Sequence, residues 1–270
     1  MVKFLWRHRF GNQLFQYCLG RILHHEFGVR VEFPPHFYKD EAHTAPYDDL
    51  WRPQSQNGGS LLNFKRLMPL INQSAFIPVH GHLFDPALLK KIRPLLLCGW
   101  FQRYEYYQPH KELIRKEWLL LPSLDRVDVH PDDLHLHIRR CDYALPHTCP
   151  NVAIWATPLL HLERAIAMFP SWRRMVIVTD APDDTFLDHF RNNYDAEVKS
   201  GSMTDDFLTL AAAKKLIISE STFAWWPAFL GRAERIVCPI RKNSFWNNKH
   251  VPEMNLIVHD ESRFEFPLMD

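Results

Sequence analysis

The chain has 270 residues, and 46% of them are hydrophobic, which is enough for a buried core and excludes a disordered chain. Its 32 Lys and Arg and 31 Asp and Glu nearly cancel to a formal charge of +1, so no overall positive field favours nucleic acid as a partner. A local cluster of basic residues must therefore bind any anionic ligand.

The cysteines and the apolar segments indicate the cellular compartment. The cysteines are odd in number, and their spacing matches neither a zinc site nor a dense disulfide framework; they are Cys18, Cys98, Cys141, Cys149 and Cys238. No secretory signal is visible in residues 1–10, and no apolar stretch approaches the roughly 20 residues of a membrane helix. We expect reduced thiols and a cytoplasmic location.

The first third of the chain predicts a strand, a helix and a second strand. Residues 2–6 read as a strand and residues 7–11 as a loop. Apolar residues recur every four positions through residues 12–27, which predicts a helix that stops at Gly28. Residues 29–33 read as the next strand.

The middle of the chain has a weaker pattern. Pro, Asn, Ser and Gly interrupt residues 34–81, where we expect loops and short helices. A strand is predicted at residues 95–101 and a helix at residues 108–118. Residues 121–131 are polar with two prolines and read as an interdomain linker.

The second half alternates regularly. Strands are predicted at residues 134–138, 175–179, 216–219 and 235–238. Helices are predicted after Thr157 and at residues 183–191, 204–214 and 221–230. This order is typical of an α/β fold with parallel sheets. We predict two Rossmann-like lobes, an N-terminal one at residues 1–127 and a C-terminal one at residues 128–270.

Ligands of parallel sheets bind at the carboxyl ends of strands, and Arg139 and Arg140 follow such a strand. Arg offers a planar fork that matches phosphate oxygens. Adjacent residues point in opposite directions if the strand continues, so one arginine can face the ligand while the other forms a structural ion pair, with Asp142 as a candidate partner. The alternative is a surface salt-bridge cluster.

Two more strand ends carry candidate ligand groups. Ser221 and Thr222 stand at a helix start, where hydroxyls and backbone N–H groups can hold a phosphate, although any capped helix looks the same. Asp180 can accept two N–H bonds from one edge of guanine, although it can also be a turn residue.

The first strand-helix turn holds Gly11 and Asn12. Glycine allows a ligand close to the backbone, and Asn12 can donate to a sugar or phosphate oxygen. The glycine pattern of a Walker loop or a dinucleotide fingerprint is absent from the sequence.

No metal and no cofactor is expected. The carboxylate doublets at residues 132–133, 183–184 and 205–206 each have a turn or helix-start explanation, and the 16 histidines show no metal-ligand spacing. Arginine would then take the place of a metal in neutralising a leaving diphosphate.

Four segments together resemble glycosyltransferase family 11, the α-1,2-fucosyltransferases. They are FGNQLFQY at residues 10–17, GWFQ at 99–102, HIRRCDY at 137–143 and ISESTFAWW at 218–226. The sequence departs from the family pattern at residues 7–10, where Arg-His-Arg-Phe replaces a glycine pair. It also has Cys141 in place of Gly and Glu220 in place of Asn.

The resemblance implies a GT-B-like fold and metal-free, inverting transfer of fucose from GDP-fucose. Arg139 would hold the β-phosphate, while His137 and Asp180 would meet guanine. Ser221 and Thr222 would hold diphosphate oxygens. The C-terminal lobe would bind the GDP-sugar, and the N-terminal lobe would be the acceptor side. Gly11 and Asn12 would approach the donor from the N-terminal lobe.

The candidate catalytic residues are Arg139, Asp142 and Asn12. The general base is open between Asp142 and His147, which share a loop. The donor sugar is open too, because GDP-rhamnose or another GDP-deoxyhexose is an alternative to GDP-fucose. A binding module for GDP or a glycan is the non-catalytic alternative. The expected partners are a GDP-sugar and an oligosaccharide acceptor, and a lipid-linked acceptor would imply peripheral membrane association.

Overall fold

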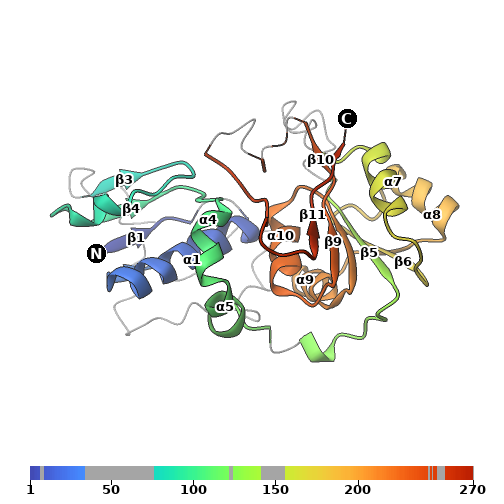
Figure 1. Ribbon diagram of the computed structural model, residues 1–270, viewed down its shortest axis with the longest axis horizontal. Helices are drawn as coiled ribbons and strands as arrows, with labels where there is room; N and C mark the ends of the chain where they lie inside the picture. The colour runs from blue at the N-terminus through green and yellow to red at the C-terminus, as the bar shows by residue number, and fades with distance from the viewer. Residues whose placement is uncertain are drawn as a thin grey trace. The chain divides into compact units, whose positions relative to one another are not determined.

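The computed structural model describes residues 1–6, 9–33, 76–121, 124–140, 156–242, 244, 246–247 and 253–269. The chain forms two compact units (Figure 1). Unit 1 contains Met1–Leu120 and Val251–Leu256, and unit 2 contains Leu121–His250 and Ile257–Asp270. Residues 121–127 thus lie with the second unit, and a late segment returns to the first. No helix in the described ranges is both long and apolar enough to cross a membrane.

Unit 1 is built on a four-stranded parallel sheet with the order β2-β1-β4-β3. Its strands are β1 (Val2–Phe4), β2 (Val31–Glu32), β3 (Ile77–Val79) and β4 (Leu95–Leu97). Strand β3 corrects the prediction of loops and short helices over residues 34–81, of which residues 34–75 lie outside the described ranges. Three residues are too few to show a period of two.

Helix α1 (Phe10–Phe27) confirms the predicted helix but begins two residues earlier. It ends at Gly28, whose φ of 60° is the left-handed conformation that glycine adopts without steric cost. A side chain at Gly20 would have its Cβ only 2.3 Å from the Phe33 ring. Glycine there lets α1 approach the aromatic side chains of the sheet.

The predicted continuous helix at residues 108–118 is a sequence of short turns. Residues 108–118 form the 3₁₀ turn η3 (Gln108–His110), α5 (Lys111–Leu113) and the π-helical turn η4 (Ile114–Trp118). The 3₁₀ turn η2 (Pro86–Lys90) and the short helix α4 (Tyr104–Tyr107) precede them. Pro109 has no N–H to donate at the first break. At the end, the N–H of Leu119 reaches back five residues to the carbonyl of Ile114 at 2.8 Å.

Unit 2 contains a six-stranded parallel sheet with the order β11-β9-β8-β5-β6-β7. The strands are β5 (Leu134–Ile138), β6 (Met175–Thr179), β7 (Glu197–Lys199), β8 (Lys215–Ile218), β9 (Arg235–Val237) and β11 (Phe264–Glu265). Strands β10 (Ile240–Arg241) and β12 (Leu268–Met269) form a separate parallel pair. The four predicted strands are confirmed, and together the two sheets confirm the predicted GT-B-like α/β class.

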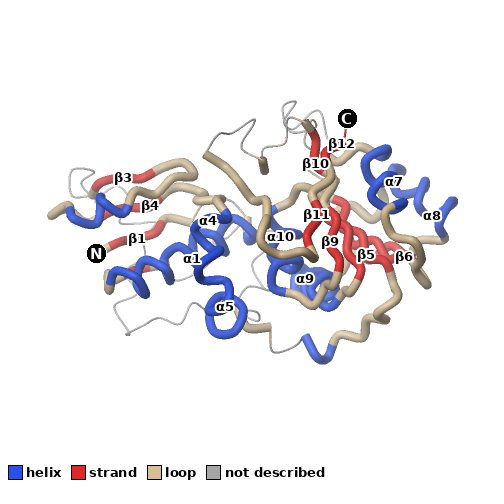
Figure 2. The backbone as a smooth tube through the Cα atoms, viewed as in Figure 1, coloured by secondary structure: helices blue, strands red, loops and turns tan. Residues whose placement is uncertain are grey.

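The helices of unit 2 lie on both faces of this sheet (Figures 1 and 2). They are α7 (Leu159–Ala167), α8 (Asp188–Tyr194), α9 (Met203–Ala212) and α10 (Thr222–Leu230), with 3₁₀ turns η5 (Leu124–Arg126) and η7 (Thr185–Leu187). The predicted helix at residues 183–191 is therefore the turn η7 followed by α8. Asp184 starts the turn because its side chain accepts the N–H of Phe186.

Alternation along β5 assigns its side chains to the two faces. Leu134, Leu136 and Ile138 belong to the core that also contains buried residues of α7 and α8. His137 faces the other way, with its ring 5.8 Å from that of Phe223 on α10. The strand is buried on both sides, which is typical of a central parallel strand.

Candidate functional site

The candidate donor site lies at one edge of the unit 2 sheet. Strand β5 is hydrogen-bonded to β6 on one side and β8 on the other. Arg139, Asp180 and Ser219 each follow the last residue of one of these strands. Parallel strands end at the same edge, so residues far apart in sequence meet there.

Arg139 forms an ion pair with Asp180. Its Nη1 lies 2.9 Å from Asp180 Oδ2, and the two side chains are only 15% and 24% exposed. Asp180 Oδ1 accepts the backbone N–H of Arg140 at 2.8 Å. The carboxylate therefore fixes both the side chain and the backbone of the arginine segment.

These contacts show how Asp180 is held within the protein, and its predicted contact with guanine stays a prediction. Recognition of guanine by two N–H bonds needs both carboxylate oxygens, but Oδ2 is shielded from solvent and lies against Arg139. The described geometry fits a residue that orients Arg139.

Arg140 has a structural environment. Its Nε donates to Asp184 Oδ2 at 2.8 Å, and its guanidinium lies over the Phe186 ring, 4.1 Å from the centroid. The prediction that one of the two arginines forms a structural ion pair is confirmed, with Asp184 as the partner. Asp142, the partner named from the sequence, lies outside the described residues, as do His147, Cys141 and Cys149.

His137 is buried beneath this edge. It is 3% exposed, and its Nδ1 lies 2.8 Å from the hydroxyl oxygen of Ser219. Burial lowers the pKa of His137 to about 4, although the charge of Asp180 acts in the opposite direction. The ring is therefore neutral at physiological pH and supports the floor of the site without adding a charge.

The start of α10 offers backbone N–H donors. Ser221 is the N-cap residue, but its hydroxyl makes no capping bond. The first bond at this end runs from the N–H of Trp225 to the carbonyl of Ser221, at 2.9 Å. The N–H groups of Thr222, Phe223 and Ala224 have no acceptor among the described residues, so this helix start can accept an anion.

The carboxylate of Glu220 is bound by Ser244 and Arg241. Its carboxylate accepts from the hydroxyl of Ser244 and the backbone N–H of Arg241, and the Arg241 guanidinium lies 3.6 Å away. Burial raises the pKa of Glu220, while Ser244 and Arg241 lower it. Because these groups hold the carboxylate, the departure from the family's Asn is accommodated within the second unit.

Asp206 is an acidic group near this edge that the sequence analysis assigned only to a helix start. It lies in the first turn of α9, where Ser202 caps the helix through the N–H of Asp205. Burial raises the pKa of Asp206 to about 6; the N–H of Gly201 lowers it, and the charges of Asp205 and Asp180 raise it further. The sequence cannot predict this raised pKa, because it depends on burial and on Asp180 from another strand end.

The other carboxylate doublets have structural partners. Asp133 is buried and receives Arg173 at 2.8 Å and Arg174 at 3.1 Å. Asp184 pairs with Arg140 and starts a 3₁₀ turn. The turn explanation is confirmed for Asp184, and Asp133 has ion pairs that the sequence did not predict.

Unit 1 has its own cluster of polar side chains at the carboxyl ends of its strands. Asn12 lies in the first turn of α1 and accepts a hydrogen bond through its side-chain oxygen from the Gln102 amide, which follows β4. The His82 ring stacks on Trp100 at 5.4 Å between centroids. Gly11, predicted in a loop, lies inside the first turn of α1 and is buried.

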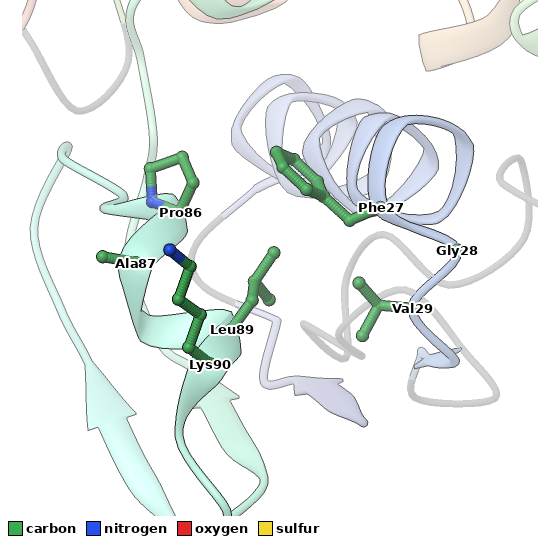
Figure 3. Close-up of a pocket in the computed structure, with 7 residues that line it drawn as sticks. All are labelled: Phe27, Gly28, Val29, Pro86, Ala87, Leu89 and Lys90. Atoms are coloured by element: carbon green, nitrogen blue, oxygen red, sulfur yellow. The ribbon is translucent and has the colours of Figure 1, made fainter.

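A hollow of about 560 Å³ lies at the opposite end of α1 (Figure 3). It is lined by Phe27, Gly28, Val29, Pro86, Ala87, Leu89 and Lys90. Since ligands of parallel sheets bind at the strand ends that precede the helices, this hollow lies at the wrong end of α1 for the donor.

The model of the family described as glycosyl transferase family 11 matches residues 110–250, which is more than half of the chain. The chain belongs to glycosyl transferase family 11. The match confirms the family resemblance and includes two of the four sequence segments, at residues 137–143 and 218–226. Arg139, Asp180 and Ser221 all lie within the matched range.

Solved structures extend the comparison of this family 11 chain. A mutant of FUT1 from Arabidopsis thaliana in complex with GDP is 10% identical, covers 87% of this chain and 69% of its own, and has a TM-score of 0.52. NodZ alpha-1,6-fucosyltransferase, co-crystallised with GDP, is 13% identical over 88% of this chain and 94% of its own, with a TM-score of 0.45. Comparison with curated proteins finds no significant match. At such low identity, the first likeness supports the fold.

Proposed function

We propose that this family 11 glycosyltransferase transfers fucose from GDP-fucose to a glycan hydroxyl, with inversion and without a metal. The acceptor position we propose is O2 of galactose. The observation that carries the proposal is the edge of the second unit, where Arg139 is held by Asp180 close to the start of α10. A guanidinium and open N–H groups are the donors that a leaving diphosphate needs.

In this mechanism, Arg139 binds the β-phosphate, on which negative charge grows as the glycosidic bond breaks. Donors that are already oriented toward such charge stabilise the transition state more than the bound substrate. Ser221 and Thr222 contribute hydroxyls and the N–H of Thr222 to the same diphosphate. Asp180 keeps Arg139 in place.

Other residues complete the proposed site. His137 supports the guanine end of the site as a neutral ring, and Gly11 and Asn12 contact the donor. Asp142 is our candidate base for the acceptor hydroxyl, with His147 as its rival in the same loop. An oligosaccharide is the acceptor, and a lipid-linked one would bring the enzyme to a membrane surface.

A GDP-release assay tests the proposal. GDP-fucose, GDP-mannose, UDP-galactose and UDP-glucose are each supplied with a panel of β-galactosides, and GDP or UDP is measured. We expect release that depends on both GDP-fucose and an acceptor. A chain that binds GDP but never releases it would be a binding module, and faster turnover of another sugar nucleotide would reassign the donor.

A further inference from the structure

Three metal-ligating side chains meet at the C-terminal end of α1. His25 and Glu26 come from the helix, and His110 comes from η3. Glu26 Oε1 lies 3.2 Å from His25 Nδ1 and 3.8 Å from His110 Nδ1. One potential ligand atom of each residue lies within 4.8 Å of the other two.

The two distances from Glu26 Oε1 are close to those of a tetrahedral metal site. Zinc binds imidazole and carboxylate at about 2.0–2.2 Å, so neighbouring ligand atoms of a tetrahedral site lie about 3.3–3.5 Å apart. Two histidines and one glutamate, with a fourth position left for water, form a ligand set that zinc and nickel accept. We propose that His25, Glu26 and His110 bind one divalent transition-metal ion.

The surroundings prepare the ligands. The His110 ring stacks on Trp118 at 6.1 Å, and His25 meets the same indole edge-on at 6.0 Å. Glu26 supplies the negative charge, and the Arg21 guanidinium, 5.4 Å from the centre of the Trp118 ring, opposes the cation.

The position of the site makes it structural. His25 lies 13 residues after Asn12 in the same helix, which is about 20 Å at 1.5 Å per residue. A bound metal would join the end of α1 to η3, far along the chain. Binding to the folded state alone raises stability by mass action, so the metal should raise the melting temperature and leave turnover unchanged.

Calorimetry of the metal-free full chain with zinc chloride tests the site. His110→Ala and His25→Ala should weaken the tightest binding event by about tenfold or more, since even the outer partners of metal ligands have effects of that size. His24→Ala is the matched control, because His24 is an exposed neighbour whose Nδ1 lies 3.1 Å from the carbonyl oxygen of Val29. Its binding should equal that of the unmodified chain.

Two further readouts keep the proposal falsifiable. Zinc should raise the melting temperature of the unmodified chain and of His24→Ala, but not that of His110→Ala. Nickel should quench a part of the tryptophan fluorescence that Trp118→Phe removes. If His110→Ala and His24→Ala bind zinc alike, or if the unmodified chain shows no saturable site, the cluster is an aromatic contact with a His-Glu hydrogen bond and the proposal is wrong.

Discussion

The adjacent arginines should separate catalysis from stability. Arg139 forms an ion pair with Asp180 at the proposed diphosphate site, and Arg140 is held by Asp184 and Phe186. We expect Arg139→Ala to lower kcat about a hundredfold or more, equal to about 2.7 kcal/mol, which is the cost of a lost donor to developing negative charge. GDP-sugar binding should weaken less, because the interaction strengthens in the transition state.

The magnitude for Arg140 comes from two contacts. Its hydrogen bond to Asp184 at 2.8 Å joins charged groups that are about one-fifth exposed, and its guanidinium is 4.1 Å from the Phe186 centroid. A bond between such groups contributes about 1.5–3 kcal/mol, and a cation-π contact about 0.5–1 kcal/mol. Solvent screening reduces the first value, so Arg140→Ala should lose about 2 kcal/mol of unfolding free energy. Its turnover per folded molecule should stay near normal.

The assay pairs steady-state GDP release with urea unfolding for both variants. Arg139→Lys restores the charge without the planar fork, so its rescue should be partial. If Arg140→Ala lost turnover while Arg139→Ala kept it, the two roles would be exchanged. If both stayed folded and fully active, the arginine mechanism would be refuted.

Three further predictions concern neighbouring groups. Asp180→Asn should lower kcat, because it loosens Arg139, and should leave the preference for GDP over UDP intact. Loss of that preference, measured by calorimetry, would instead support contact between Asp180 and guanine. Excess EDTA should leave turnover unchanged, and restoration of a lost activity by Mn²⁺ or Mg²⁺ would show a catalytic metal. Burial lowers the pKa of His135 from its usual 6.5 to about 4, so the unfolded chain takes up this proton first as the pH falls. The free energy of unfolding should therefore decrease from about pH 6.5 to pH 4, and His135→Gln should flatten that slope by up to about 1.4 kcal/mol per pH unit. Chemical denaturation across this range measures both slopes, and equal slopes would contradict the assignment.

The sequence was sufficient for the elements with strong local patterns. The runs at Leu134–Ile138 and Met175–Thr179 were predicted with their observed bounds, because β-branched and leucine-rich runs follow directly from side-chain chemistry. The strands Glu197–Lys199 and Phe264–Glu265 were missed, since two or three residues show no periodicity and depend on their neighbours in the sheet.

Within the site, sequence position identified groups but not their partners. The strand ends of the second unit predicted that Arg139, Asp180 and Ser221 gather at one edge. That Arg140 pairs with Asp184, or that Glu220 turns toward Ser244, depends on contacts between distant segments. A turn acid and a ligand-binding acid look the same in sequence, which is why the contacts of Asp180 had to come from the structure.

The most direct test of the central claim is NMR analysis of the product formed from GDP-fucose and a β-galactoside. We expect one new fucose, joined to O2 of galactose, with an anomeric configuration opposite to that of the donor. Retained configuration would contradict the inverting mechanism. A product at another hydroxyl would contradict the proposed acceptor position, and no transfer at all by a chain that still binds GDP would contradict the enzymatic role.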